Sequence, residues 1–286
     1  MIIAVTELLQ DEIAATLQAK GYRHIFKLTA HEEHLLMSEY FASIGKFPLA
    51  VKPIYRRNGN DSGSNGVFSL YEVRHHLDKP LRNRPELRSW EIPIQAGAEP
   101  AGIRICEQQD NDGDNISDKN KQYCEASAMY SVWKNASAEW VGIEHYRRHL
   151  LVTPDMLSDD IDAVMPLPYI CFPNSGSQFR RFVGEEVAWA LHKALRELHP
   201  DKYETYVRCL NGEYHYAYNM IVAKKAVFDK FCEWAFNIAG YIETLALQSV
   251  KETRALAYVM EQLTSIYFIA NRDKSMIVHA EKAIYT

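Results

Sequence analysis

The chain has 286 residues, of which 47% are hydrophobic and 24% are charged, and this balance is typical of a packed globular protein. The formal net charge of −5 argues against a nucleic-acid partner, because binding to phosphates needs a basic face. Five widely spaced cysteines without a CxxC pair indicate neither a disulfide framework nor a thiolate zinc site.

The first 56 residues predict a small α/β extension. Apolar, β-prone residues at 2–6 and 24–28 indicate two strands around a helix that Gly21 ends, and a second helix follows at 31–45. The chain shows no basic leader before an apolar run, and no apolar run approaches the roughly 18 to 20 residues that cross a bilayer. We therefore expect a cytoplasmic protein.

A run rich in asparagine, glycine and serine at residues 57–66 favours turns and is the predicted linker to a second unit. That unit, residues 67–286, mixes strand-like and helix-like segments, which indicates an α/β fold. Strands are expected at 91–95, from 140 onward, at 162–166, within 216–224 and at 276–280. Helices are expected at 119–135, 184–198, 201–210, 226–249 and 253–270.

The densest group of reactive side chains follows the strand that begins at Trp140: Glu144, His145, Tyr146, Arg147, Arg148 and His149. A carboxylate beside an imidazole can hold a divalent ion, and two guanidinium groups can bind a diphosphate. Loops after buried strands are where α/β proteins commonly keep their chemistry. The pattern indicates a phosphate or metal-phosphate site, although a solvated, salt-bridged strand end explains the same residues.

Three other features fit a functional or a structural interpretation. The polar run at 107–120, expected on the surface, contains GDNIS at 113–117, which suits ribose or sugar hydroxyls but also a plain turn. Asn219 interrupts an apolar strand, so its amide needs a backbone or ligand partner. Glu261 lies on an apolar helix face, where a buried carboxylate could act as a general base. The absence of GxGxxG, GxxxxGK, GxSxG and HExxH motifs argues against common dehydrogenases, kinases, hydrolases and zincins.

Six blocks of sequence, taken in order over about residues 68–277, resemble a bacterial family long described as a domain of unknown function. The family is associated with capsular and exopolysaccharide biosynthesis and is marked by a VGLxHYRRxF signature. The blocks are RHHLDKPL, EIPIQAGA, DNDGDNISDKNKQYCEASAMYSVWKN, WVGIEHYRRHL, YNMIVAKKAVFDKFCEWAF and RALAYVMEQLTSIYF. The chain departs from the family in CEASAMYSVWKN, where CELTALYWIWKN is more usual, and at Gln262, where arginine is more usual.

The resemblance implies a GT-A-like glycosyltransferase: a nucleotide-sugar-binding mixed sheet flanked by helices over residues 67–286, after the N-terminal α/β extension at 1–56. It implies transfer of a hexosyl group, galactosyl or galactofuranosyl in some relatives, from a UDP-sugar to a growing surface polysaccharide. The acceptor would be lipid-linked or an oligosaccharide, which leaves peripheral attachment to the inner membrane face open.

The resemblance also implies roles for individual residues. Glu261 and Glu125 are the candidate catalytic bases. Glu144 and His145 are the candidate ligands of Mn²⁺ or Mg²⁺, but the Asp-x-Asp motif usual in that fold is missing here, which leaves metal dependence open. The candidate substrate-binding residues are Asp114, Asn115, Ser117, Asn120, Tyr123, Lys134, Arg147, Arg148 and Asn219.

Two rival functions fit parts of the sequence. A non-catalytic nucleotide- or glycan-binding subunit of a polysaccharide assembly complex agrees with the missing Asp-x-Asp motif and with an N-terminal extension that has no assigned role. A metal-dependent hydrolase built on the histidines of the chain is weaker, because His75, His76, His145 and His149 follow no ligand spacing.

Overall fold

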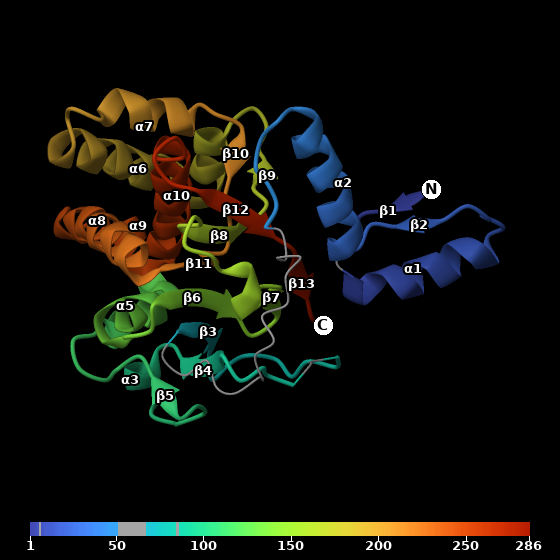
Figure 1. The fold of residues 1–286 in the computed structure, drawn as a ribbon, viewed down its shortest axis with the longest axis horizontal. Helices are drawn as coiled ribbons and strands as arrows, with labels where there is room; N and C mark the ends of the chain where they lie inside the picture. The colour runs from blue at the N-terminus through green and yellow to red at the C-terminus, as the bar shows by residue number, and fades with distance from the viewer. Residues whose placement is uncertain (6, 51–66, 84–85) are drawn as a thin grey trace.

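The computed structural model describes residues 1–5, 7–50, 67–83 and 86–286, so the predicted linker at 57–66 lies outside the described residues. The centre of the molecule is a nine-stranded mixed sheet with long helices packed on one face (Figure 1). This arrangement confirms the predicted fold class, an α/β fold with a mixed sheet flanked by helices.

Seven strands follow one another across the sheet in the order β12–β8–β11–β6–β3–β4–β5. β11 runs antiparallel to both of its neighbours, and the other neighbouring pairs on this path are parallel. β7 continues from β6 through a tight turn and pairs with β13. The bounds are β3 (Phe68–Arg74), β4 (Glu91–Gln95), β5 (Gln108–Gln109), β6 (Trp140–His145), β7 (Arg148–Leu150), β8 (Ala163–Pro166), β11 (Ile221–Lys224), β12 (Ile277–Ala280) and β13 (Lys282–Ile284).

The alternation of side chains along β6 divides the core in two. Successive strand residues point to opposite faces of a sheet, so Val141 and Ile143 join the large core beneath the helices, while Trp140 joins a smaller core on the other face. Gly142 is required by close packing, because a Cβ added there would lie 2.6 Å from a methyl group of Val222. Glu144 and His145 continue this alternation, so their side chains lie on opposite faces of the sheet.

The helices cover the large core and carry part of the site. α5 (Ala126–Asn135), α6 (Ser175–Leu198), α8 (Lys225–Thr244) and α10 (Ala255–Ala270) bury their apolar faces against the sheet and one another. Shorter helices are α3 (Ala98–Ala101), α4 (Asn120–Tyr123), α7 (Tyr203–Leu210) and α9 (Gln248–Glu252), with 3₁₀ turns η1 (Ser117–Lys119) and η2 (Pro154–Met156). No helix in the described ranges combines the length and apolar character of a membrane span.

Most predicted elements of the second unit are confirmed, but the helix expected at 119–135 is wrong. The backbone of Cys124 takes φ 47° and ψ −126°, which ends α4, and α5 begins two residues later. The helix expected at 184–198 begins earlier, at Ser175, with Gly184 in a non-helical conformation (φ 80°) inside it. The helix expected at 226–249 divides into α8 and α9.

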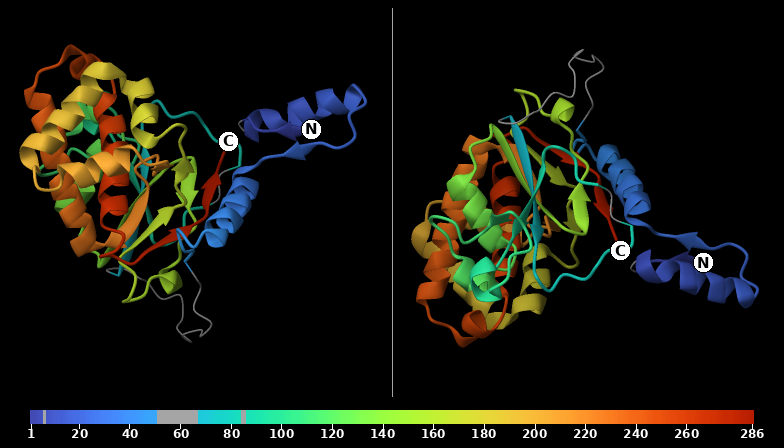
Figure 2. Two further views of the ribbon diagram at one scale, coloured as in Figure 1. Left: turned by 90° about the horizontal axis from the view of Figure 1, so that it is seen from above. Right: turned by 90° about the horizontal axis from the view of Figure 1, so that it is seen from below.

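The N-terminal elements form the expected alternation of β and α. β1 (Ile2–Ile3) pairs in parallel with β2 (Phe26–Lys27) around α1 (Glu7–Ala19), and this small unit projects from the body (Figure 2). α2 (Ala30–Ser43) lies against the body instead, because its fully buried Phe41 packs edge-on against Phe47 and Tyr214. The strands β9 (Tyr169–Ile170) and β10 (Tyr214–His215) form a second small sheet beside α2.

Candidate functional site

His145 ends β6 at the edge of the sheet where the parallel strands β3 and β6 both finish. Its Nε2 lies 2.6 Å from the carbonyl oxygen of Tyr218, in the loop that leads into β11. A carbonyl oxygen can only accept, so Nε2 carries a hydrogen and donates it. This bond fixes the ring and leaves Nδ1 available at the edge of the sheet.

Asn219 connects three elements at the same place. Its side chain is fully buried, its amide nitrogen donates to Glu125 Oε1 at 2.8 Å, and its amide oxygen accepts from Thr264 Oγ1 at 3.3 Å. The amide that interrupts the apolar strand pattern is therefore satisfied by α10 and by the residue that precedes α5. The sequence-predicted residues Glu125, His145 and Asn219 come together here.

Glu125 has the properties of a proton acceptor. Burial raises the pKa of Glu125 above its ordinary value; the charge of His145 lowers it, the neighbouring carboxylate of Glu261 raises it, and the hydrogen bond from Asn219 lowers it. The residue as a whole is nevertheless only half-buried. Glu261 approaches from α10, where its side chain is 17% exposed and lies 3.6 Å from Nε2 of His215.

The backbone around these residues takes conformations that side chains disfavour. Cys124, Tyr218 and Asn219 all have positive φ angles of 47°, 71° and 51°, a region in which residues other than glycine are uncommon. Such strain persists only where the surrounding structure holds it, and it gathers at functional sites. The two segments that meet through the hydrogen bond between Glu125 and Asn219 are both strained.

A cationic and aromatic group lies on the other side of Tyr218. The guanidinium carbon of Arg148 lies 4.2 Å from the centre of the Tyr218 ring, and its buried Nε has no hydrogen-bond partner. Lys282 donates to the Tyr169 hydroxyl at 2.6 Å, and burial lowers the pKa of Lys282 to about 8, against the opposing influence of Glu33. Of these residues, Tyr169 and Lys282 line a pocket of about 200 Å³ whose other wall includes residues of α2.

Asp78 is a site residue that the sequence interpretation missed. It follows β3 and accepts a hydrogen bond from the backbone N–H of His75 at 2.7 Å. Burial raises the pKa of Asp78, while the charges of His75, Arg147 and His145 act in the opposite direction, which places these groups around it. The signal was the RHHLDKPL block, which entered the resemblance without a role. Tyr169, Tyr218 and Lys282 were missed because no local motif marks them.

The polar run at 107–120, expected on the surface, is partly buried. Two of the predicted binding residues, Ser117 and Asn120, belong to a buried network around Asp110, and the others lie elsewhere. Asp110 is fully buried and accepts from the N–H groups of Gly97 and Ala98 and from two serine hydroxyls, one of them Ser117. Asn120 donates to the Cys124 carbonyl at 2.8 Å and so connects this network to the residue before Glu125.

The remaining members lie away from His145. Asp114 is exposed and pairs with Lys134 at 3.7 Å on the surface of α5. Asn115 closes a turn by donating to the carbonyls of Asn111 and Gly113. Tyr123 is buried among helices, where its hydroxyl donates to Glu243 at 3.1 Å. The structure therefore does not bring these side chains to the edge of the sheet at His145.

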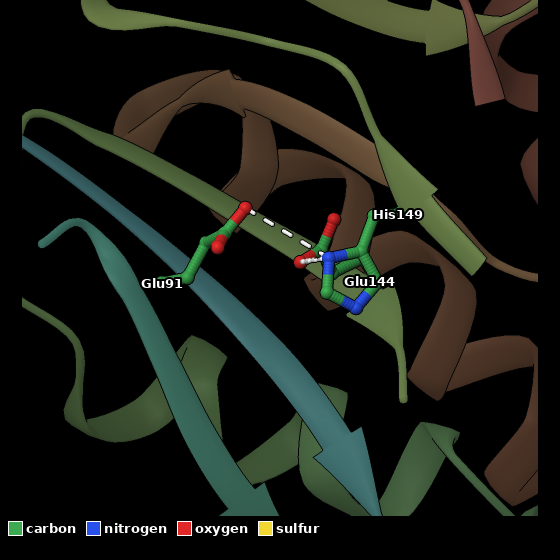
Figure 3. A group of neighbouring side chains, drawn as sticks. All are labelled: Glu91, Glu144 and His149. Carbon is green, nitrogen blue, oxygen red and sulfur yellow. Dashed lines mark ion pairs between the residues drawn. The ribbon is translucent and has the colours of Figure 1, made fainter. Parts of the chain in front are cut away.

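The predicted metal pair Glu144 and His145 does not converge. As neighbours on one strand they point to opposite faces: Glu144 is buried on the face of the smaller core, beside His149 (Figure 3), while His145 reaches Tyr218. Among the described residues, the one converging group of three or more potential metal ligands is Glu91, Glu144 and His149. The side chains beside His145 do not form such a group, whereas Arg147 and Arg148 offer cations there.

The comparisons with known proteins agree with the fold. The chain is similar to the apo structure of WbbM, a bifunctional glycosyltransferase, with a TM-score of 0.64 and 24% identity over 76% of this chain. The match covers 45% of WbbM, so this chain spans less than half of that protein. The mannosyltransferase Ktr4p from S. cerevisiae matches at a TM-score of 0.33 and 10% identity over 80% of this chain and 76% of its own, too weak a similarity for any argument. No curated protein matches.

A family model described as a domain of unknown function, DUF4422, matches residues 75–272. The match contains β6, the loop before β11 and α10 in full, and so it includes Glu125, His145, Asn219 and Glu261. Because this region is well over half of the chain, the protein belongs to the DUF4422 family.

Proposed function

We propose that the protein is a glycosyltransferase that moves a hexosyl group, galactosyl or galactofuranosyl among the candidates, from a UDP-sugar to a growing surface polysaccharide. The observation that carries the proposal is the meeting of Glu125, Asn219 and His145 at the carboxyl edge of β6. The similarity of the fold to the glycosyltransferase WbbM supports the reaction class. Ligands of open α/β sheets bind outside the carboxyl ends of the strands.

In this proposal Glu125 is the base. An acceptor hydroxyl attacks the anomeric carbon of the donor sugar, the bond from that carbon to the diphosphate oxygen breaks, and UDP leaves. The carboxylate of Glu125 takes the hydroxyl proton, and its raised pKa makes it a better proton acceptor near neutral pH than an ordinary glutamate. Glu261 is the second candidate for the same role, and its charge acts on Glu125 in either case.

Arginine supplies the positive charge that the departing diphosphate needs. Arg147 is exposed beside His145, and Arg148 has a buried Nε without a partner. A guanidinium can bind two oxygens of a phosphate at once, so this pair fits a diphosphate. Because the described side chains beside His145 do not converge as ligands of a divalent metal, the proposed reaction assigns no role to Mn²⁺ or Mg²⁺ there.

The other predicted residues support the site or lie outside it. We propose that Ser117, Asn120 and Tyr123 fix the loop and α4 before Glu125, while Asp114, Asn115 and Lys134, which lie away from His145, are not assigned to the donor site. A lipid-linked or oligosaccharide acceptor enters by the pocket beside Tyr169. In this proposal residues 67–286 form the catalytic domain and residues 1–56 an extension that contributes α2 to that pocket.

Release of UDP tests the proposal. The full chain is incubated with a panel of UDP-sugars and with oligosaccharide acceptors, and UDP is measured for the wild type and for His145→Ala and Arg147→Ala. We expect turnover of one donor and a loss of at least about 100-fold in each variant. The exposed Arg208→Ala on α7 is the matched control and keeps the wild-type rate. Tight UDP binding in calorimetry without turnover of any donor would favour a non-catalytic binding subunit instead.

A further inference from the structure

A second group of reactive side chains lies behind the candidate site, on the opposite face of the sheet. Glu72 comes from β3, Glu91 from β4, Glu144 from β6 and His149 from β7, and their exposed fractions are 0%, 6%, 0% and 1%. Figure 3 shows Glu91, Glu144 and His149 pointing toward one another. Carboxylates are almost never buried this fully unless they are paired or bind a metal.

Three atoms of this group, one from each of Glu91, Glu144 and His149, lie close to one another, and the pair from Glu144 and His149 is already at the spacing of zinc ligands. Nδ1 of His149 is 3.5 Å from Glu144 Oε1 and 3.9 Å from Glu91 Oε1, and all three atoms lie within 4.8 Å of each other. None of the three takes part in a hydrogen bond, although Arg88 Nη2 lies 2.8 Å from Glu91 Oε1 as an ion pair. In a tetrahedral zinc site with bonds of about 2.0–2.2 Å, ligand atoms stand about 3.3–3.6 Å apart.

The second oxygen of each of Glu144 and Glu91 is held by a backbone N–H group, so the first oxygen of each stays directed toward Nδ1 of His149. The backbone N–H of Leu150 donates to Glu144 Oε2 at 2.8 Å, and that of Arg88 donates to Glu91 Oε2 at 2.8 Å. Nε2 of His149 lies 3.4 Å from Glu72 Oε2 as an ion pair and makes no hydrogen bond. A histidine that binds a metal through one ring nitrogen commonly donates the other N–H to a carboxylate, and Glu72 has that position.

We propose that Glu91, Glu144 and His149 Nδ1 bind one divalent transition-metal ion of the Zn²⁺ class, with Glu72 orienting the imidazole. Two carboxylates and an imidazole suit such an ion better than Ca²⁺, which takes oxygen ligands. The ion joins β4, β6 and β7 and so holds both sides of the turn that carries His145, Arg147 and Arg148. It is a site separate from the one proposed for sugar transfer, because Glu144 and His145 face opposite sides of the sheet.

Metal content and zinc titration test this without any sugar donor, so the result does not depend on the proposed reaction. The full chain is dialysed against a chelator and then titrated with Zn²⁺, with elemental analysis for stoichiometry and calorimetry for affinity. We expect one ion per chain, a loss of affinity of at least about 100-fold in His149→Gln and Glu144→Gln, and about 10–100-fold in Glu72→Gln. His145→Gln, on the other face, keeps the wild-type affinity.

X-ray absorption spectroscopy of the zinc-loaded wild type should show imidazole and carboxylate ligands. This measurement tests the proposal even if a variant fails to fold. Less than about 0.1 equivalent bound by folded wild-type protein would overturn the proposal. So would a nitrogen-15 NMR spectrum under saturating zinc in which both ring nitrogens of His149 carry protons. That second result would identify His149 as a buried imidazolium that pairs with the carboxylates, since a protonated nitrogen cannot bind a metal.

Discussion

Replacing Asp110 with asparagine should destabilise the protein more than a change of one atom suggests. Each carboxylate oxygen accepts one backbone N–H and one serine hydroxyl: Oδ1 from Ala98 (3.0 Å) and Ser117 (2.5 Å), Oδ2 from Gly97 (2.8 Å) and Ser127 (2.6 Å). In either orientation of the asparagine amide, its nitrogen faces a backbone N–H that cannot accept. The backbone bond to that atom is lost and its buried N–H is left without a partner, while the serine hydroxyl there keeps its bond only by turning round to accept from the amide nitrogen.

The magnitude follows from these four bonds. A hydrogen bond to a charged group contributes about 1.5–3 kcal/mol, and a buried unsatisfied donor costs about 1–3 kcal/mol. Since the three remaining bonds also lose their charge assistance, we expect Asp110→Asn to lower the free energy of unfolding by about 3–5 kcal/mol. Native domains have only about 5–15 kcal/mol in total, so the variant should be close to unfolding at moderate temperature.

Urea denaturation of the two proteins measures this difference directly. Asp112→Asn is the matched control, because Asp112 is exposed two residues away and its substitution should stay within about 0.5 kcal/mol. A loss below about 1 kcal/mol for Asp110→Asn, with the same slope against urea, would refute the reasoning. It would mean that the two serine hydroxyls and the loop rearrange to satisfy the amide.

Three further outcomes are expected. Burial lowers the pKa of His279 from 6.5 to about 4. Between these pH values the folded state binds fewer protons than the unfolded state, so the free energy of unfolding falls by about 3 kcal/mol as pH falls from 6.5 to 4. His279→Gln should flatten this pH dependence in urea titrations, and a variant whose stability depends on pH as in the wild type would contradict it. Burial lowers the pKa of Lys282 to about 8, so its contribution to the free energy of unfolding should rise as pH rises from 8 to 10.5, where the unfolded state binds more protons. A carbon-13 NMR titration that finds an ordinary pKa near 10.4 would reject this. Phe41→Ala should cost about 3–5 kcal/mol, measured by thermal unfolding, whereas the 43% exposed Phe26 should tolerate the same change.

Several strands were predictable from local sequence because their apolar runs are bounded by polar turns, but the central strand β3 (Phe68–Arg74) was missed, since residues 67–100 were expected to hold only one short strand, at 91–95. β4, β8, β11 and β12 lie within the expected ranges, and the amide of Asn219 was correctly identified as one that needs a partner. The break at Cys124 was not predictable, because no glycine or proline marks it. The burial of Asp110 was equally hidden, since its four donors come from segments up to 17 residues away.

The adjacency of Glu144 and His145 shows why spacing alone misleads. Two neighbours in a strand cannot share a site on one face, because their side chains alternate. The contact that defines the candidate site, Glu125 with Asn219, spans 94 positions in the sequence and depends on how α5 meets the loop before β11. A local pattern identified Asn219 as a candidate and the family resemblance identified Glu125, but only the packing of the sheet and helices brings them together.

The rate of UDP release by Glu125→Gln is the most direct test of the central claim, that the half-buried carboxylate of Glu125 at the edge of the sheet takes the acceptor proton. Glutamine keeps the size of the side chain and its contact with Asn219 but cannot accept a proton. We predict that kcat falls by about 10²–10⁴, with UDP affinity within about threefold of wild type. Turnover by Glu125→Gln at the wild-type rate, with the variant folded and its preferred donor saturating, would contradict the account.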